Sequence, residues 1–580
     1  MVPRVSKIFS PKTLIPLILF FLLCRPLLSH GEPAGNRYGG TLVRSTTSDP
    51  KSFNDIVAQE TSTTLITSRI FDGLTTINGV TLKVEPALAE RWEVSADGLT
   101  WTFYLRRGVL WSDGIPLTAD DVVFTFNDLI YNDAVASPAR DIFTIEEKIF
   151  NVEKVDDHTV RFTLPVRFAP FLNGMSQGIL PKHKLQKAVQ DGKFNFTWGI
   201  DTKPSEIVGT GPFQLAQYSP GERIVLEKNT RYWKKSPEGN ALPYLDKVIF
   251  IITQSQDVAL LKFIDGELDY VGVRGADYSV LKPWERKKDF TIYDSGPDFG
   301  SSFIVFNQNQ DSNPKTGKPF LDPVKGAWFR DINFRRAVAH AIDKRKMIDI
   351  VMNGLAYPQD SEMSPSAGFF YNPDVLKYDY DLARARKILE EAGYADRDHN
   401  GVIEDSEGHP VEFNLYTNSG NNERLQIAAI IRQDLQNIGM KVNFLPLEFN
   451  SLVTKLNSSF DWDAIILGLT GGVEPHFGKN VWHSTGTLHL WHPQQKSPAT
   501  DWEKRMDEIF DTGVQELDDN KRKALYDEFQ VIVSRQLPVV YTILQGDLVA
   551  VRNKFGNLKP TSFGGAFHNL EEIYIKEGYR

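Results

Sequence analysis

The chain has 580 residues, with 65 Lys and Arg against 74 Asp and Glu and a net charge of −9. This length exceeds what one hydrophobic core supports and predicts about two to four domains. The acidic balance cannot neutralise a phosphate backbone, which excludes a typical nucleic-acid-binding protein. A single cysteine excludes intramolecular disulfides and four-cysteine zinc sites.

The first 31 residues have the pattern of an export signal. Three basic residues precede an apolar run from Leu14 to Cys24, and Ser29 and Gly31 are small residues at the spacing that signal peptidase reads. A membrane-spanning helix needs about 20 apolar residues, so the run is too short for an anchor. We therefore expect a signal peptide over residues 1–31. The alternative is a lipid anchor at Cys24, which the bulky Leu23 disfavours.

Patterns in the first half alternate between strands and helices. Large apolar residues at every second position of 101–105 predict a strand with one buried face. Thr118 and Asp121 have the spacing of a capping box and predict the start of a helix. A Ser-Pro-Gly-Glu turn joins strand patterns at 213–218 and 223–227, which predicts a hairpin.

The second half predicts a strand–helix–strand unit. The strands are expected at 411–416 and 441–445, with an amphipathic helix at 423–438 between them. Two more helices, at 334–342 and 382–392, precede this unit. The fold class is therefore mixed α/β.

Several sequence signatures of common enzymes are absent. The chain lacks an H-E-x-x-H motif, a phosphate loop and a complete G-x-G-x-x-G. Residues 209–212 begin like a dinucleotide loop, but Pro212 removes a backbone N–H that a phosphate needs, so we interpret them as a turn. One segment gathers four histidines, none of them four positions apart as on one face of a helix and none joined by a cysteine, which favours a polar surface or cleft loop over a metal site: His476, His483, His489 and His492.

Residues 396–407 fit a twelve-position calcium loop. The candidate metal ligands are Asp396, Asp398, Asn400, Val402, Glu404 and Glu407. A helix pattern enters the loop, but a strand pattern leaves it, so the segment is not a complete helix–loop–helix hand. Two interpretations stay open, a structural Ca²⁺ site and an acidic turn that needs no ion.

An ordered series of motifs runs through nearly the whole chain after residue 31. It includes Pro86–Trp92, Leu105–Val109, Trp111–Gly114, Leu117–Phe124, Gly209–Phe213, Phe334–Asp343 and Ala383–Gly393. This series resembles the family 5 extracellular solute-binding proteins, which include periplasmic oligopeptide- and dipeptide-binding proteins. Such a series identifies a family better than it identifies a ligand.

The resemblance implies a two-lobed periplasmic-binding-protein fold, with mixed sheets flanked by helices, an extra inserted subdomain and a hinge. Lobe I would combine residues 32–83, 205–299 and 538–580, the inserted subdomain would be 84–204, and lobe II would be 300–537. Lobe closure couples ligand binding to docking in such proteins. The implied protein is a periplasmic monomer without enzyme activity or a required cofactor, which captures peptides and delivers them to an inner-membrane ABC permease.

The resemblance also points to a missing carboxylate. Peptide binders of this family hold the peptide's α-ammonium with an aspartate a few residues after the strand that here ends near Leu469. That position falls on Gly471 or Gly472. Since a buried ammonium needs a paired anion, either Glu474 or another acid binds it, or the ligand has no free amine.

The candidate ligand-binding residues are therefore Gln59, Thr61, Phe449, Leu469, Thr470, Gly471, Gly472, Glu474, Trp482 and Tyr541. Core packing is the alternative role for Phe449 and Tyr541, because aromatic residues are buried in most folds. Three functions stay open. The leading one is peptide capture, the second is the same fold with an oligosaccharide or another non-peptide solute, and the third is an exported hydrolase.

Overall fold

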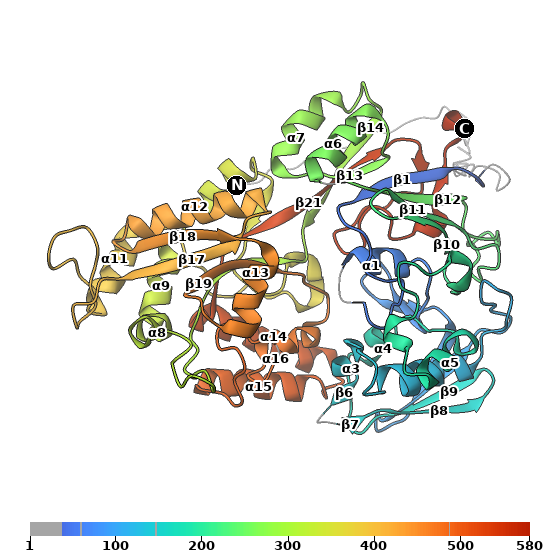
Figure 1. The fold of residues 1–580 in the computed structure, drawn as a ribbon, viewed down its shortest axis with the longest axis horizontal. Coiled ribbons are helices and arrows are strands. Elements are labelled where there is room, and N and C mark those ends of the chain that lie inside the picture. Colours follow the sequence, from blue (N-terminus) through green and yellow to red (C-terminus); the bar gives the residue numbers. More distant parts are fainter. Residues whose placement is uncertain (1–36, 59–60, 146–147, 254, 487) are drawn as a thin grey trace, which may run out of the picture.

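The computed structural model describes residues 37–58, 61–145, 148–253, 255–486 and 488–580 (Figure 1). The expected signal peptide with Cys24 lies outside these residues, and so does the candidate ligand contact Gln59. Among the helices that are described, none is long and apolar enough to cross a membrane. Figure 1 shows two lobes joined by strands that run between them.

The first sheet belongs to the lobe that carries β1 and has the strand order β1-β12-β11-β10. β1 (Thr41–Thr46) pairs in parallel with β12 (Lys247–Ile252). β11 (Arg223–Lys228) is antiparallel to β12 and to β10 (Phe213–Ser219), which confirms the predicted hairpin. β1 is an edge strand of this sheet, and α1 (Thr61–Thr67) follows it in the chain.

A second, antiparallel sheet lies farther from the hinge in the same half of the molecule (Figure 1). Its order is β4 (Ala89–Val94), β5 (Thr100–Leu105), β9 (Thr159–Thr163) and β8 (Asn151–Asp156). The large apolar side chains of β5 at positions 101, 103 and 105 are buried and the residues between them are half-buried, as the sequence predicts. The Thr118 N–H donates to the Asp121 carboxylate at 3.0 Å, and α2 (Ala119–Val123) begins directly after Thr118.

The third sheet forms the centre of the other lobe. Its order is β18 (Lys441–Leu447), β17 (Glu412–Asn418), β19 (Ala464–Leu469), β15 (Ser301–Phe306) and β20 (Val539–Tyr541). β17 and β18 are parallel and are joined by α12 (Asn422–Gln436), which confirms the predicted strand–helix–strand unit. β20 extends this sheet beyond residue 537, where lobe II was expected to end.

Helices cover both faces of this third sheet (Figure 1). α9 (Ile332–Ala341) and α11 (Leu382–Glu391) match the two helices predicted before the strand–helix–strand unit. They pack with α12 and one face of the sheet in a common hydrophobic cluster. α15 (Asp501–Gly513) and α16 (Asp519–Gln536) contribute to a separate cluster with the other face.

The hinge is a fourth sheet, built around the ten-residue strand β21 (Ile543–Arg552). β13 (Tyr270–Gly272), β14 (Phe290–Pro297) and β16 (Ala356–Pro358) all pair with β21. The chain crosses between the lobes from β14 to β15 and again from β20 to β21. Far from the hinge the two halves also touch, because the Ala169 N–H donates to the Val514 carbonyl at 2.7 Å.

Candidate functional site

Two adjoining cavities lie at the hinge, between the lobes. The first has a volume of about 380 Å³ and takes its lining from the end of β1, from β13 and the residues after it, and from β21. The second, of about 260 Å³, is lined by the start of β15, the first turn of α12 and the end of β19. Asp298, Glu423 and Gln545 line both cavities, so the two form one groove.

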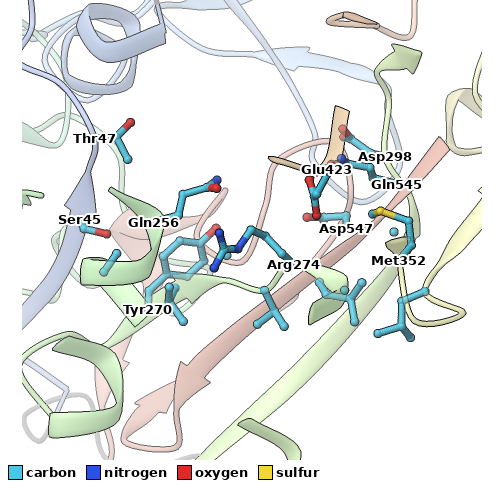
Figure 2. Close-up of a pocket in the computed structure, with 18 of the residues that line it drawn as sticks. Ser45, Thr47, Gln256, Tyr270, Arg274, Asp298, Met352, Glu423, Gln545 and Asp547 are labelled. Carbon is cyan, nitrogen blue, oxygen red and sulfur yellow. Dashed lines mark hydrogen bonds between the residues drawn. The ribbon is translucent and has the colours of Figure 1, made fainter. Parts of the chain in front are cut away.

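Carboxylates gather at one end of this groove. Figure 2 shows Asp298, Glu423 and Asp547 there, whereas Ser45, Thr47 and Gln256 lie at the opposite end. Burial, together with a smaller effect of the nearby Asp298 charge, raises the pKa of Asp547 to about 6. Burial also raises the pKa of Glu423, despite the positive charge of Arg274.

Arg274 lies between the two ends of the groove (Figure 2). Its Nε donates to Asp277 at 2.7 Å, and its guanidinium also bonds Asp257 at 2.6 Å. These carboxylates belong to α7 (Gly275–Leu281) and α6 (Gln256–Asp265). The charge of Arg274 is therefore balanced by its own neighbours.

A third cavity, of about 460 Å³, also lies between the two halves. Asp55, Phe71 and Gln177 line it from one half, and Phe477, a 41% exposed side chain, lines it from the other. Asp55 accepts hydrogen bonds from Thr67 Oγ1 at 2.5 Å and Gln177 Nε2 at 3.2 Å. The space between the lobes thus continues away from the hinge.

The structure brings part of the predicted site together at the groove. Leu469 and Thr470 line the second cavity. Gly471 lies against the backbone of Phe299, where an added Cβ would be 1.7 Å from the carbonyl oxygen. At Gly472 an added Cβ would meet no atom within 4 Å. The first glycine is therefore required by close packing, and the second is not.

Glu474 lies elsewhere, in the interior of lobe II. Its side chain and that of Arg522 are only 4% and 5% exposed, and Arg522 Nη1 donates to Glu474 Oε2 at 2.8 Å in a two-pronged pair. Glu474 also accepts the His476 N–H at 3.0 Å. Burial alone would lower the pKa of Arg522, but the Glu474 charge raises it. This carboxylate is already neutralised and lines none of the three cavities.

The aromatic candidates are also buried in lobe II. Trp482 packs against Trp491 and Phe529, with ring centroids 5.7 and 5.3 Å apart. Tyr541 lies on β20 and packs edge-on against Phe303. Neither lines the groove, which matches the core-packing alternative for Tyr541.

The remaining candidates lie at the starts of helices. Thr61 is the exposed first residue of α1. Phe449 begins α13 (Phe449–Thr454), but its side chain is outside what the structure describes. Ligand contact by either residue stays a prediction.

The predicted calcium loop brings three of its carboxylates together. Ligand oxygens of Asp396, Asp398 and Glu404 lie within 4.8 Å of one another, and no other cluster of three or more His, Cys, Asp or Glu side chains this close occurs in the described residues. The four histidines singled out in the sequence therefore do not form such a cluster. Asp396 and Asp398 each accept the Asn400 N–H at 3.1 Å.

Two further candidate ligands of the calcium loop are arranged differently. The Asn400 side-chain oxygen accepts the Val402 N–H at 2.8 Å. Glu407, at position 12, has a 79% exposed side chain that lies 3.9 Å from His409. Calcium binding at this loop stays a prediction.

Sequence reasoning did not identify the hinge carboxylates Asp298 and Asp547. Neither residue belongs to a recognisable motif, and the two lie 249 positions apart in the chain. The available indication was that Asp298 directly precedes the lobe boundary expected at residue 299. Residues at a lobe crossing face the space where a ligand binds between domains.

The sequence of this chain matches a family of known proteins. The model of the bacterial extracellular solute-binding proteins, family 5, matches residues 83–487. A probable ABC transporter-binding protein of Deinococcus radiodurans is 30% identical, over 86% of both chains. The oligopeptide-binding protein AppA of Bacillus subtilis is 27% identical, over 84% of this chain and 86% of AppA.

Solved structures show the same architecture. AppA of Bacillus subtilis in complex with a nonapeptide superposes with a TM-score of 0.74 at 24% identity, covering 93% of this chain and 100% of AppA. The binding protein MelB of Agrobacterium fabrum, in complex with stachyose, gives a TM-score of 0.75 at 21% identity, covering 94% of this chain and 86% of MelB. The predicted two-lobed fold is confirmed.

Proposed function

The chain belongs to the family 5 bacterial extracellular solute-binding proteins, and we propose that it captures peptides between its lobes and delivers them to an ABC permease of the inner membrane. Its relatives described above are solute-binding proteins, not enzymes. One of them is an oligopeptide-binding protein, which favours peptides as the ligand class.

The observation that carries this proposal is a groove lined by strand ends from both lobes. On one side, β1 is an edge strand, and the residues 45–47 at its end line the cavity. On the other side, β19 pairs with β17 only at Ala464 and Ile465, whereas its end at Leu469 lines the cavity. An extended peptide gains affinity by pairing its backbone with such strand edges.

This mode of binding suits a transporter that accepts many sequences. Main-chain hydrogen bonds are the same for every peptide, so affinity does not depend on one side chain. The first cavity offers polar groups of different kinds, including Ser45, Gln256 and Gln545, instead of one deep apolar pocket. We therefore propose broad specificity for side chains.

We further propose that the protein works as a monomer in the periplasm. Membership of an extracellular family supports export, and the pattern of residues 1–31 supports a cleaved signal peptide. After export, closure of the two lobes about the β21 sheet would present the loaded form to the permease.

An oligosaccharide is the second candidate ligand. The similar structure of MelB holds stachyose, and the open backbone at Gly472 leaves room for a bulky guest beside Thr470. This candidate requires no ammonium-binding acid.

A thermal-unfolding screen separates the two ligands. We expect free peptides to raise the unfolding midpoint of the purified protein and stachyose to leave it unchanged. A ligand at 100 times its dissociation constant stabilises the folded state by about 2.7 kcal/mol. A shift with stachyose and none with any peptide would overturn the peptide assignment.

We also propose that the loop 396–407 binds Ca²⁺ in a structural role. If so, millimolar Ca²⁺ raises the unfolding midpoint, EDTA reverses the shift, and Asp398→Asn abolishes it, because the metal loses a charged oxygen ligand. Glu391→Gln is the matched control, since Glu391 is an exposed acid just before the loop. If Ca²⁺ leaves the unfolding midpoint of the wild-type protein unchanged, the loop is a turn that binds no ion.

A further inference from the structure

The loop after β19 cannot supply an acid for a peptide's amino terminus. A side chain at position 471 is excluded by the Phe299 carbonyl, and Gly472 has room but no side chain. The Glu474 carboxylate is already paired with Arg522 in the interior of lobe II. If the ligand carries a free amine, the carboxylate that pairs with it must come from another part of the groove.

The residue next to Phe299 supplies such a carboxylate. Asp298 lines both hinge cavities, and the Asp298 N–H donates to the Gln545 carbonyl at 2.8 Å. This bond and the pairing of Pro297 with Gly546 bring Asp298 close to Asp547. Figure 2 shows both aspartates at the same end of the cavity, beside Glu423.

These two aspartates lack a cation of their own. Neither forms an ion pair within the described residues, whereas Arg274 is held by Asp257 and Asp277. Asp547 Oδ2 is buried and has no hydrogen-bond partner there. Two neighbouring carboxylates in a partly closed cavity repel each other, and a bound cation relieves that repulsion.

The missing cation is better supplied by an amine than by a metal ion. A hard metal such as Ca²⁺ needs at least six oxygen ligands around one point. The hinge carboxylates are not among the clusters of three acids within 4.8 Å of one another in the described residues. An ammonium group needs only two or three acceptors, which Asp298, Asp547 and Gln545 can provide.

We propose that Asp547 and Asp298 bind the protonated α-amine of the peptide and so take the role of the aspartate that is absent at positions 471 and 472. This inference rests on the proposed function and adds the direction of the ligand, with its amino terminus at the β14–β21 end of the groove. The raised pKa of Asp547 agrees with an unpaired negative charge that a ligand amine would stabilise.

The test is isothermal titration calorimetry on the exported, purified protein. The probes are trialanine, pentaalanine and a nonapeptide, each with a free and an N-acetylated amino terminus. We expect acetylation to weaken binding to the wild-type protein by about 30-fold or more, because a buried charge loses its partner. Asp547→Asn and Asp298→Asn should each weaken the binding of the free peptides by a similar factor.

Asp294→Asn is the matched control. Asp294 is an exposed acid on β14 whose charge reaches Asp547, but it does not line the groove. We expect its removal to change peptide affinity by less than about twofold, because exposed charges are screened. The unfolding midpoint of each variant without ligand shows whether it is folded.

Acetylation separates a direct contact from damage to the fold. If the aspartates bind the amine, Asp547→Asn should bind free and acetylated peptides with nearly equal affinity, and its affinity for acetylated peptides should match that of the wild-type protein. A variant with a damaged groove would instead bind both forms more weakly than the wild-type protein does. Equal affinity of the wild-type protein for both forms would overturn this inference and leave peptide capture intact. Failure of the wild-type protein to bind any free peptide would contradict the proposed function itself.

Discussion

Arg522→Met is expected to lower the free energy of unfolding by about 3–5 kcal/mol, because it leaves the Glu474 carboxylate buried without its partner. Arg522 also donates through Nε to the Gly513 carbonyl at 3.0 Å and lies over the rings of Phe370 and Tyr526. Methionine keeps most of the apolar contact and removes the charge. Urea unfolding followed by tryptophan fluorescence measures the loss.

An exposed ion pair between α15 and α16, the helix that carries Arg522, provides the control. Arg505 on α15 bonds Glu528 on α16 at 2.7 and 2.8 Å, with side chains 42% and 43% exposed. Arg505→Met should cost less than about 1 kcal/mol, since water solvates the remaining carboxylate. Adding Glu474→Gln to Arg522→Met should recover part of the loss, because the buried charge is then absent. Equal costs at Arg505 and Arg522 would contradict the prediction.

Gly471→Ala is expected to destabilise the protein by about 3 kcal/mol and to weaken ligand binding at least about tenfold. The new Cβ would be 1.7 Å from the Phe299 carbonyl oxygen, so either the hinge crossing or the end of β19 must move. Both segments line the groove, because Asp298 precedes Phe299 and Thr470 precedes Gly471. Unfolding and peptide titration measure the two effects.

Gly472→Ala is the control for this prediction. The two glycines are adjacent, neither has a left-handed backbone, and an added Cβ at 472 meets no atom within 4 Å. Alanine there should leave stability unchanged or raise it by about 0.4–1 kcal/mol, because it restricts the unfolded chain. Equivalent losses at both positions would show that the close approach at Phe299 is not what requires glycine.

Much of the fold could be predicted from local patterns. The alternation in 101–105, the capping box at Thr118 and the hairpin at 213–227 each matched an element of the structure. So did the strand–helix–strand unit, in which β17 and β18 are parallel. These features are encoded within a few residues or by one periodicity, so they need no knowledge of distant contacts.

The candidate site was harder to predict, because residue type does not fix where a side chain points. Glu474 has the charge expected of an ammonium ligand, yet it pairs with Arg522, which lies 48 positions away in the chain. Trp482 has a flat indole ring that could stack on a ligand, yet it packs against Trp491 and Phe529. Among the candidates whose side chains the structure describes, only Leu469, the last residue of β19, and Thr470, which follows it, line the groove.

The sequence by itself determined the family, the two-lobed fold and the absence of an acid at positions 471 and 472. The tertiary structure decided which carboxylates line the groove. Asp298 and Asp547 meet because β14 pairs with β21 in a register that sets Pro297 opposite Gly546. That register depends on hydrogen bonds between strands far apart in the chain and on the packing of both lobes around the hinge, and no local stretch of sequence contains either.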